Sequence, residues 1–239
     1  MESFMLVLEL IGTMAFSAAG TMTGLRKNMD IFGVCILGLS TAVGGGVIRD
    51  LILGCTPPAT FRDPIYVTVS LLTSLVLFLP QLRHLLMRDH ARFDLVLFWM
   101  DAVGLGIFTA VGIRAAFAQM AHPTLSLLVF VGVVTGAGGG VLRDVLAGDT
   151  PYIFVKHIYA SASLAGALVC VLLWHPAGSA AAMLLAAGLL QRTDSGVTAV
   201  LGILGYNVLY LLLIVLGDNA SRWHLWLGLL AGLADGCYW

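Results

Sequence analysis

The chain has 239 residues, of which 59% are hydrophobic and 10% are charged, and its mean hydropathy is +0.98. Soluble domains carry about 25% charged residues, and here the few charges lie between long apolar runs. The composition therefore excludes a soluble globular protein and predicts a polytopic membrane protein. A formal net charge of −1 gives no sign of nucleic-acid binding, which requires a basic surface.

Apolar runs follow one another along the chain, each close to the ~20 residues that a transmembrane helix needs. Six spans are expected at about residues 4–24, 31–53, 65–82, 95–118, 124–147 and 153–174. The first run lacks a basic start and contains Glu9, so we interpret it as a retained span and not a signal peptide. The link at 83–94 is the most charged stretch. In the hydrophobic region 178–239, residues 178–191 form a marginal seventh span, and seven, eight or nine crossings stay open.

One motif is written twice, as GGGVIRDLILG at 44–54 and GGGVLRDVLAG at 138–148, with seven of eleven residues identical. The pattern E/D-x-x-G-x-x-x-F-S/T-A-x-G also recurs, starting at Glu9 and at Asp101. Residues 4–82 and 95–174 are therefore two copies of one three-helix unit. Because three is odd, the second copy must cross the membrane inverted. The expected fold is an all-α polytopic membrane protein of two inverted three-helix repeats followed by the C-terminal helical region 178–239.

Basic residues outside the motifs predict the orientation. Seven lie on one side of the expected spans and two on the other: Arg26, Lys27, Arg83, Arg88, Arg92, Lys156 and Arg192 against Arg62 and Arg114. Because cytoplasmic loops are enriched in Lys and Arg, we expect the N-terminus outside and the 83–94 link in the cytoplasm.

Each motif begins with three consecutive glycines inside an expected span. A glycine costs about 1 kcal/mol relative to alanine in a helix, so we expect a kink or a break there. A break exposes carbonyl oxygens that can coordinate a cation. Close helix packing is the alternative, and we expect it at the GxxxG pairs Gly20/Gly24, Gly132/Gly136 and Gly228/Gly232. The candidate kink and pore residues are Gly44, Gly45, Gly46, Gly138, Gly139 and Gly140.

The Arg-Asp pair of each motif is the second candidate feature, because charges at mid-membrane cost roughly 2.5–3.5 kcal/mol on insertion scales. Neighbouring residues on a helix point about 100° apart, so each Arg is expected to meet an acid elsewhere. The expected intramembrane charge network consists of Arg49, Asp50, Arg143, Asp144, Glu9 and Asp101. A structural ion pair and a gating or ion-attracting role both stay open. Scattered histidines and cysteines predict no metal site, and no catalytic constellation predicts an enzyme.

These motifs, together with FRDP at 61–64, resemble the bacterial branch of the trimeric intracellular cation (TRIC) channel family. The family is also catalogued as a glycine transporter domain and as UPF0126. The resemblance covers about residues 4–192 and implies a seven-helix protomer and a homotrimer in the bacterial inner membrane. It also implies one K⁺- and Na⁺-conducting pore in each protomer, lined by the second and fifth helices, which bend at the glycine triplets. After Arg192 the chain continues with an apolar stretch where such proteins have a basic tail.

Three hypotheses follow. The first is a passive cation channel with no cofactor, whose partners are copies of itself, membrane lipid and the transported K⁺ or Na⁺. The second is a secondary carrier of a small zwitterion such as glycine, which inverted repeats fit equally well. The third is a membrane scaffold without transport. We favour the channel, and stepwise current against saturable uptake would separate the first two.

Overall fold

A computed structural model describes residues 2–155 and, further along, 164, 166–168 and 170–172. The helices in this part of the chain belong to one compact unit, residues 1–195. The elements are α1 (Glu2–Arg26), α2 (Ile31–Ile52), α3 (Ala59–Arg62), α4 (Ile65–Phe78), α5 (Pro80–Met87), α6 (His90–Gln119), α7 (Leu125–Leu146) and α8 (Tyr152–Val155). The described part of the chain contains no strand.

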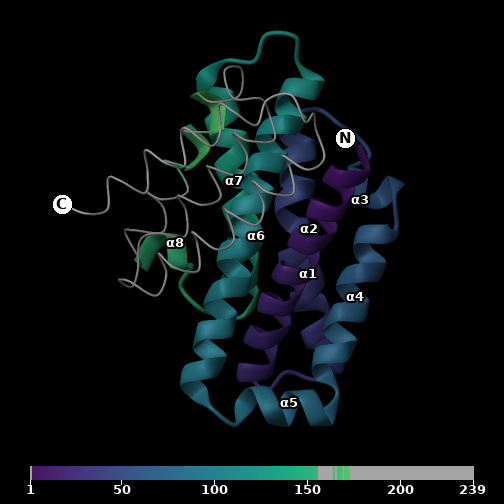
Figure 1. Cartoon of the computed structure of the whole chain (residues 1–239), viewed down its shortest axis with the longest axis vertical. Helices are drawn as coiled ribbons and strands as arrows, with labels where there is room; N and C mark the ends of the chain where they lie inside the picture. The colour runs from purple at the N-terminus through teal and green to yellow at the C-terminus, as the bar shows by residue number, and fades with distance from the viewer. Residues whose placement is uncertain (1, 156–163, 165, 169, 173–239) are drawn as a thin grey trace, which may run out of the picture. The chain divides into compact units, whose positions relative to one another are not determined.

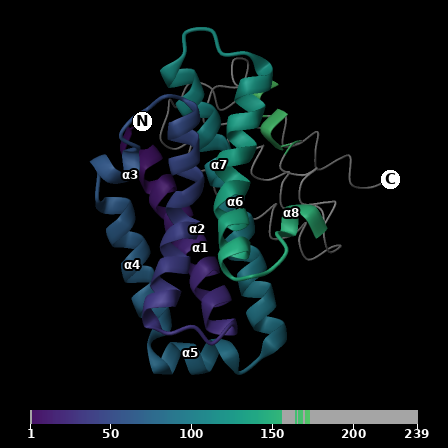
Figure 2. The same ribbon diagram turned by 180° about the vertical axis from the view of Figure 1, so that it is seen from behind.

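The long helices form a bundle in which α1 and α2 lie between α4 on one side and α6 and α7 on the other (Figure 1). The view from behind shows the same order (Figure 2). The start of α1 and the short helix α3 lie at one end, here named the α3 end, and α5 lies across the other, named the α5 end. Because α6 starts beside α5, α1 and α6 run in opposite directions, as inverted repeats require.

The all-α membrane fold expected from the sequence is confirmed. Within the described residues, four helices, α1, α2, α6 and α7, are each long and apolar enough to cross a bilayer, and they match the first, second, fourth and fifth expected spans. Asp30 and Thr124 begin α2 and α7 by accepting a backbone N–H with their side chains. Most of the sixth span and all of 178–239, including Gly228/Gly232, lie outside the described residues.

The third expected span, residues 65–82, is bent and is not one straight helix. α4 ends at Phe78, and the chain then turns by 72° into α5, which starts at Pro80. With 14 residues, α4 is about 21 Å long, shorter than the ~30 Å of a bilayer core. Pro80 ends α4, because a proline lacks the N–H that a helix interior needs. The charged link is therefore largely helical, formed by α5 and the first turns of α6.

The closing glycine of each motif ends its helix. Gly54 and Gly148 have φ values of +73° and +74°, a left-handed conformation that a residue with a Cβ adopts at a cost. The Gly54 N–H donates to the Leu51 carbonyl (3.2 Å), and the Cys55 N–H donates to the Asp50 carbonyl (2.8 Å). The same pair of bonds ends α7, so both repeats finish in the same glycine cap.

Small residues let the helices of each repeat approach closely. A Cβ on Gly20 would overlap the Thr41 hydroxyl of α2, and one on Gly136 would overlap the Thr109 hydroxyl of α6. Gly24 and Gly132 also face the neighbouring helix at contact distance. The packing role expected for these two GxxxG pairs is thus confirmed.

Candidate functional site

The glycine triplets do not break their helices. α2 and α7 are each one continuous α-helix through 44–46 and 138–140, so neither helix breaks there, and the alternative of a kink stays a prediction. The middle glycines lie where α2 and α7 cross: a Cβ on Gly45 would overlap the Thr135 carbonyl oxygen, and one on Gly139 would overlap the Thr41 carbonyl oxygen. These two contacts are related by the internal repeat. The middle glycines therefore allow backbone-to-backbone packing, the alternative considered above.

The outer glycines of the triplets have different surroundings. A Cβ on Gly44 would overlap the Leu142 side chain, while one on Gly138 would lie in ordinary contact with Gly45 Cα, 3.4 Å away. A Cβ on Gly46 would meet only Arg49 Nη2, at 3.9 Å, because Gly46 lines a cavity. The last glycine of the first triplet therefore faces open space.

At the α5 end, Arg143 lies between two acids, in a group here named the Arg143 cluster (Asp101, Arg143 and Asp144). Its Nη1 donates to Asp101 Oδ1 at 2.6 Å, and its Nε donates to Asp144 Oδ1 at 2.8 Å. All three residues are buried. The second oxygen of Asp144 accepts the Tyr152 N–H at the start of α8 (3.0 Å). The cluster thus ties α6, α7 and α8 together.

Toward the α3 end, Arg49 and Asp50 repeat part of this arrangement. Arg49 Nε donates to Asp50 Oδ1 at 2.8 Å, and Asp50 Oδ2 accepts the Ala59 N–H at the start of α3 (2.7 Å). In each motif the aspartate therefore anchors the short helix that follows it. The expectation that each Arg meets an acid elsewhere is wrong for Arg49 and right for Arg143, which bonds Asp101 as well as its own neighbour.

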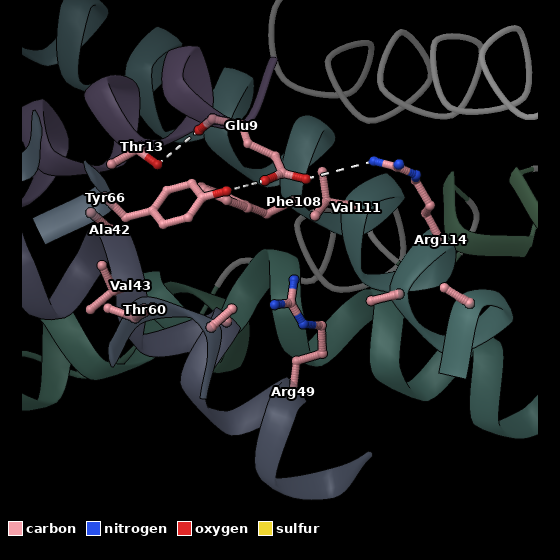
Figure 3. Close-up of a pocket in the computed structure, with 14 residues that line it drawn as sticks. Glu9, Thr13, Ala42, Val43, Arg49, Thr60, Tyr66, Phe108, Val111 and Arg114 are labelled. Carbon is pink, nitrogen blue, oxygen red and sulfur yellow. Dashed lines mark hydrogen bonds and ion pairs between the residues drawn. The ribbon is translucent and has the colours of Figure 1, made fainter. Parts of the chain in front are cut away.

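A cavity of about 250 Å³ lies beside Arg49. It is lined by residues of α1, α2, α3, α4 and α6, with Glu9, Arg49, Tyr66 and Arg114 as its charged and phenolic groups (Figure 3). None of its described lining residues comes from α7. It has room for several water molecules and is here named the Glu9 cavity.

Glu9 is held from two sides in this cavity. The Tyr66 hydroxyl donates to Glu9 Oε2 at 2.5 Å, and Arg114 Nη1 lies 3.8 Å from Glu9 Oε1. Figure 3 shows both contacts, with the Arg49 guanidinium directed into the cavity from below. Glu9 and Arg49, whose side chains the structure describes, are joined by neither a hydrogen bond nor an ion pair. An acid and two guanidinium groups therefore line one small cavity.

Two stacked phenylalanines close the centre of the bundle. The rings of Phe16 and Phe108 lie 5.3 Å apart. Phe16 packs onto Gly104, where a Cβ would overlap its ring, and a Cβ on Gly12 would lie 3.1 Å from the Phe108 ring. Phe108 also lines the Glu9 cavity. Beyond it, the space at Arg143 and Tyr152 has no room for a water molecule among the described residues. The cavity and this space share no lining residue.

Known proteins place the chain in a family. A model named glycine transporter matches residues 6–81 and 98–175, which correspond to the two repeats. The UPF0126 inner membrane protein YadS of Escherichia coli is 40% identical over 166 residues, covering 68% of this chain and 75% of YadS. A UPF0126 membrane protein of Deinococcus radiodurans is 40% identical over 162 residues, 67% and 72% of the two chains. The chain belongs to the UPF0126 family.

The solved structures most like this UPF0126 chain include the TRIC trimeric intracellular cation channel orthologue from Rhodobacter sphaeroides. The two are 31% identical, with a TM-score of 0.72, over 85% of this chain and 99% of that one. The UPF0126 family is thus the bacterial branch of the TRIC family, as the motifs indicated.

The sequence pointed to part of the site of this UPF0126 chain. Glu9, Asp101 and both Arg-Asp pairs were expected, because intramembrane charges are costly and rare. Tyr66 was missed, and Arg114 was counted only for orientation. A signal for Tyr66 exists: IYVTVSLL at 65–72 recurs as IYASASLA at 158–165. Arg114 has no such signal, because its role depends on the approach of α6 to α1.

Proposed function

We propose that the chain is a monovalent cation channel, conducting K⁺ and Na⁺, in the bacterial inner membrane. The observation that carries the proposal is the match, over 99% of its length, to a protein described as a cation channel. The inverted arrangement of α1 and α6 and the cavity between the repeats support it. The inner-membrane location is supported by YadS, which is named an inner membrane protein.

The Glu9 cavity is one end of the proposed conduction path. Its wall carries the Glu9 carboxylate, which is paired with Arg114, and the Arg49 guanidinium, which is paired with Asp50. Each cation is therefore matched by an acid, and the carboxylate oxygens are the cation ligands that the cavity offers. The Phe16–Phe108 stack closes the path in this conformation. Conduction therefore requires these two rings to separate, which a hydrophobic constriction does when it gates by wetting.

Planar-bilayer recording of the purified protein in asymmetric KCl tests the proposal. Stepwise currents that reverse toward the K⁺ potential are the expected result. Gly46→Leu should reduce them while the protein still assembles, because this side chain enters the cavity. Gly45→Leu is the matched comparison and should fail to assemble, because it overlaps α7. Silent wild-type bilayers from well-assembled protein would contradict the channel.

A carrier of a small zwitterion is the second candidate, and one observation favours it. The Glu9 cavity holds a carboxylate and the Arg49 and Arg114 guanidinium groups, which could pair with the amine and the carboxylate of one ligand. Saturable glycine uptake into liposomes, competed by close analogues and lost in Glu9→Gln, would make this candidate the working function. Uptake that rises linearly with concentration would exclude it.

The proposed assembly is a homotrimer with a separate pore in each protomer. The Rhodobacter sphaeroides protein is described as trimeric, which supports self-association of a related chain. Native mass spectrometry of the protein released from nanodiscs should give three times the mass of 25.3 kDa. A monomer retaining stepwise currents would contradict the trimer and leave the pore proposal intact.

A further inference from the structure

Equivalent acids of the two repeats have different ion-pair partners. Asp101 of the second repeat accepts a hydrogen bond from Arg143 at 2.6 Å. Glu9 is its counterpart in the first repeat, and Arg49 is the counterpart of Arg143. Yet Glu9 pairs with Arg114 at 3.8 Å, and Arg49 pairs with its own neighbour Asp50. The repeat equivalent of the Arg143–Asp101 bond is therefore unmade.

The difference in packing follows the same division. Where the arginine bonds the acid, at the Arg143 cluster, the described residues leave no space for water. Where it does not, a cavity of about 250 Å³ separates Arg49 from Glu9. The two repeats share one sequence pattern. Closing the Glu9 cavity of the first repeat so that it matches the packing of the second therefore requires a bond between Arg49 and Glu9.

Arg114 is a position at which the two repeats differ, and it bears on this asymmetry. The 92-residue offset that relates Glu9 to Asp101 relates Met22 to Arg114, and Met22 is a buried apolar side chain. Glu9 therefore has a second cation within reach, supplied by α6, and Asp101 has a methionine at the equivalent place.

We propose that Glu9 exchanges ion-pair partners: Arg114 holds it while the Glu9 cavity is open, and Arg49 takes it when the cavity closes. Arg114 is then a positioning residue that keeps Glu9 away from Arg49. The Arg114 side chain is 37% exposed, and such a pair is weak, so the exchange needs little energy. The functional meaning of the closure rests on the proposed transport path, but the closure itself can be measured without transport.

Cysteine accessibility in the full-length protein in nanodiscs tests the exchange. Val43 lines the cavity in its interior and Ala118 lies at its exposed rim. In a background with the four native cysteines replaced by serine, Val43→Cys and Ala118→Cys are modified with a cationic methanethiosulfonate. We expect Arg114→Met, the residue that the other repeat has here, to slow the modification of Val43→Cys about tenfold, a shift of about 1.4 kcal/mol in the open–closed equilibrium.

Further variants separate positioning from general structure. Arg114→Lys should restore the rate, because a cation is again available to Glu9, and Arg49→Gln added to Arg114→Met should restore it by removing the competing partner. In Glu9→Gln, Arg114→Met should have no further effect. Arg62→Met is the matched control, an exposed arginine at the α3 end outside the cavity, and should change nothing.

Three results would overturn the exchange. The first is a Val43→Cys rate unaffected by Arg114→Met; the second is a slowed rate that Arg49→Gln does not restore. The third is an equal slowing of the rim reporter Ala118→Cys, which would indicate misfolding caused by the loss of Arg114. Because none of these readings requires current or uptake, failure of the exchange is distinguishable from failure of the proposed channel.

Discussion

The two arginines of the repeated motif have different surroundings, although the sequences around them are nearly the same. Arg143 neutralises two acids in a buried cluster, whereas Arg49 pairs with one acid and faces a cavity. A buried acid that loses its cation is left unpaired in a medium of low dielectric. Arg143 is therefore expected to matter mainly for stability, and Arg49 mainly for what enters the cavity.

This difference predicts unequal losses of stability. Arg143→Gln should cost about 3–5 kcal/mol, because removing one partner of a buried pair leaves an uncompensated charge, here on Asp101 and Asp144. Arg49→Gln should cost less than half of this, since Arg49 pairs with one acid where Arg143 pairs with two. Unfolding by denaturant in mixed micelles measures both. Equal losses would show that the second acid of the Arg143 cluster adds nothing to the cost.

Position within a glycine triplet also decides its role. Gly139→Ala should destabilise by about 2 kcal/mol, because its Cβ overlaps the backbone of α2 and overpacking typically costs 1–3 kcal/mol. Gly46→Ala should instead stabilise by up to about 1 kcal/mol, since alanine is the better helix former and the space is open. The same unfolding measurement compares them, and a loss in both variants would mean that the last glycine also packs.

At the scale of the helices, the two copies of the motif end α2 and α7 with the same hydrogen bonds. Asp50 and Asp144 each accept the first N–H of the short helix that follows, and Gly54 and Gly148 each close a glycine cap. These contacts span at most nine residues. The sequence pattern therefore needs no tertiary partner to fix where α2 and α7 end.

The cap gives a prediction of its own. Gly54→Ala should destabilise by about 1–2 kcal/mol, because the left-handed conformation disfavours a Cβ, and nothing crowds the site. Gly54→Asn should lose less, since asparagine tolerates this conformation. Thermal unfolding of the two variants beside wild type measures the difference. A loss that is equal in both would point to a contact of the side chain and not to the backbone.

At the scale of the whole molecule, the charges separate by end. Arg83, Arg88 and Arg92 lie in or beside α5 and the start of α6, and Arg26 and Lys27 end α1 beside them. Arg62 and Arg114 lie toward the α3 end. Because cytoplasmic segments are enriched in basic residues, we expect the α5 end in the cytoplasm and the Glu9 cavity on the outer side.

Labelling in intact cells tests this orientation. With native cysteines removed, Phe61→Cys, at an exposed position of α3, should react with a membrane-impermeant maleimide from outside. Arg88→Cys, exposed next to α5, should react only after the cells are permeabilised. The opposite pattern would reverse the orientation while leaving the fold unchanged, because the helices and their packing do not depend on which end faces the cytoplasm.

Much of the fold could be predicted because its determinants are local or periodic. Apolar length predicts spans, as α1, α2, α6 and α7 show, and the doubled motif predicts the inverted repeats. A break was expected at the triplets because glycine has a low helix propensity, and that expectation took no account of the helix that packs against them. A continuous helix carries Gly45 when its partner is another backbone in close contact.

The membrane class, the repeat and the helix ends follow from the order of the amino acids alone, since hydrophobic runs and caps act within a few turns of chain. The acid that each arginine meets, the cavity at Gly46 and the approach of Arg114 to Glu9 follow from how the helices pack. Ion-pair partners and cavities depend on where helices cross, and crossings are set by side chains about a hundred residues apart in the chain. The two motifs have nearly the same sequence, but the residues of α1 and α6 that lie next to them differ.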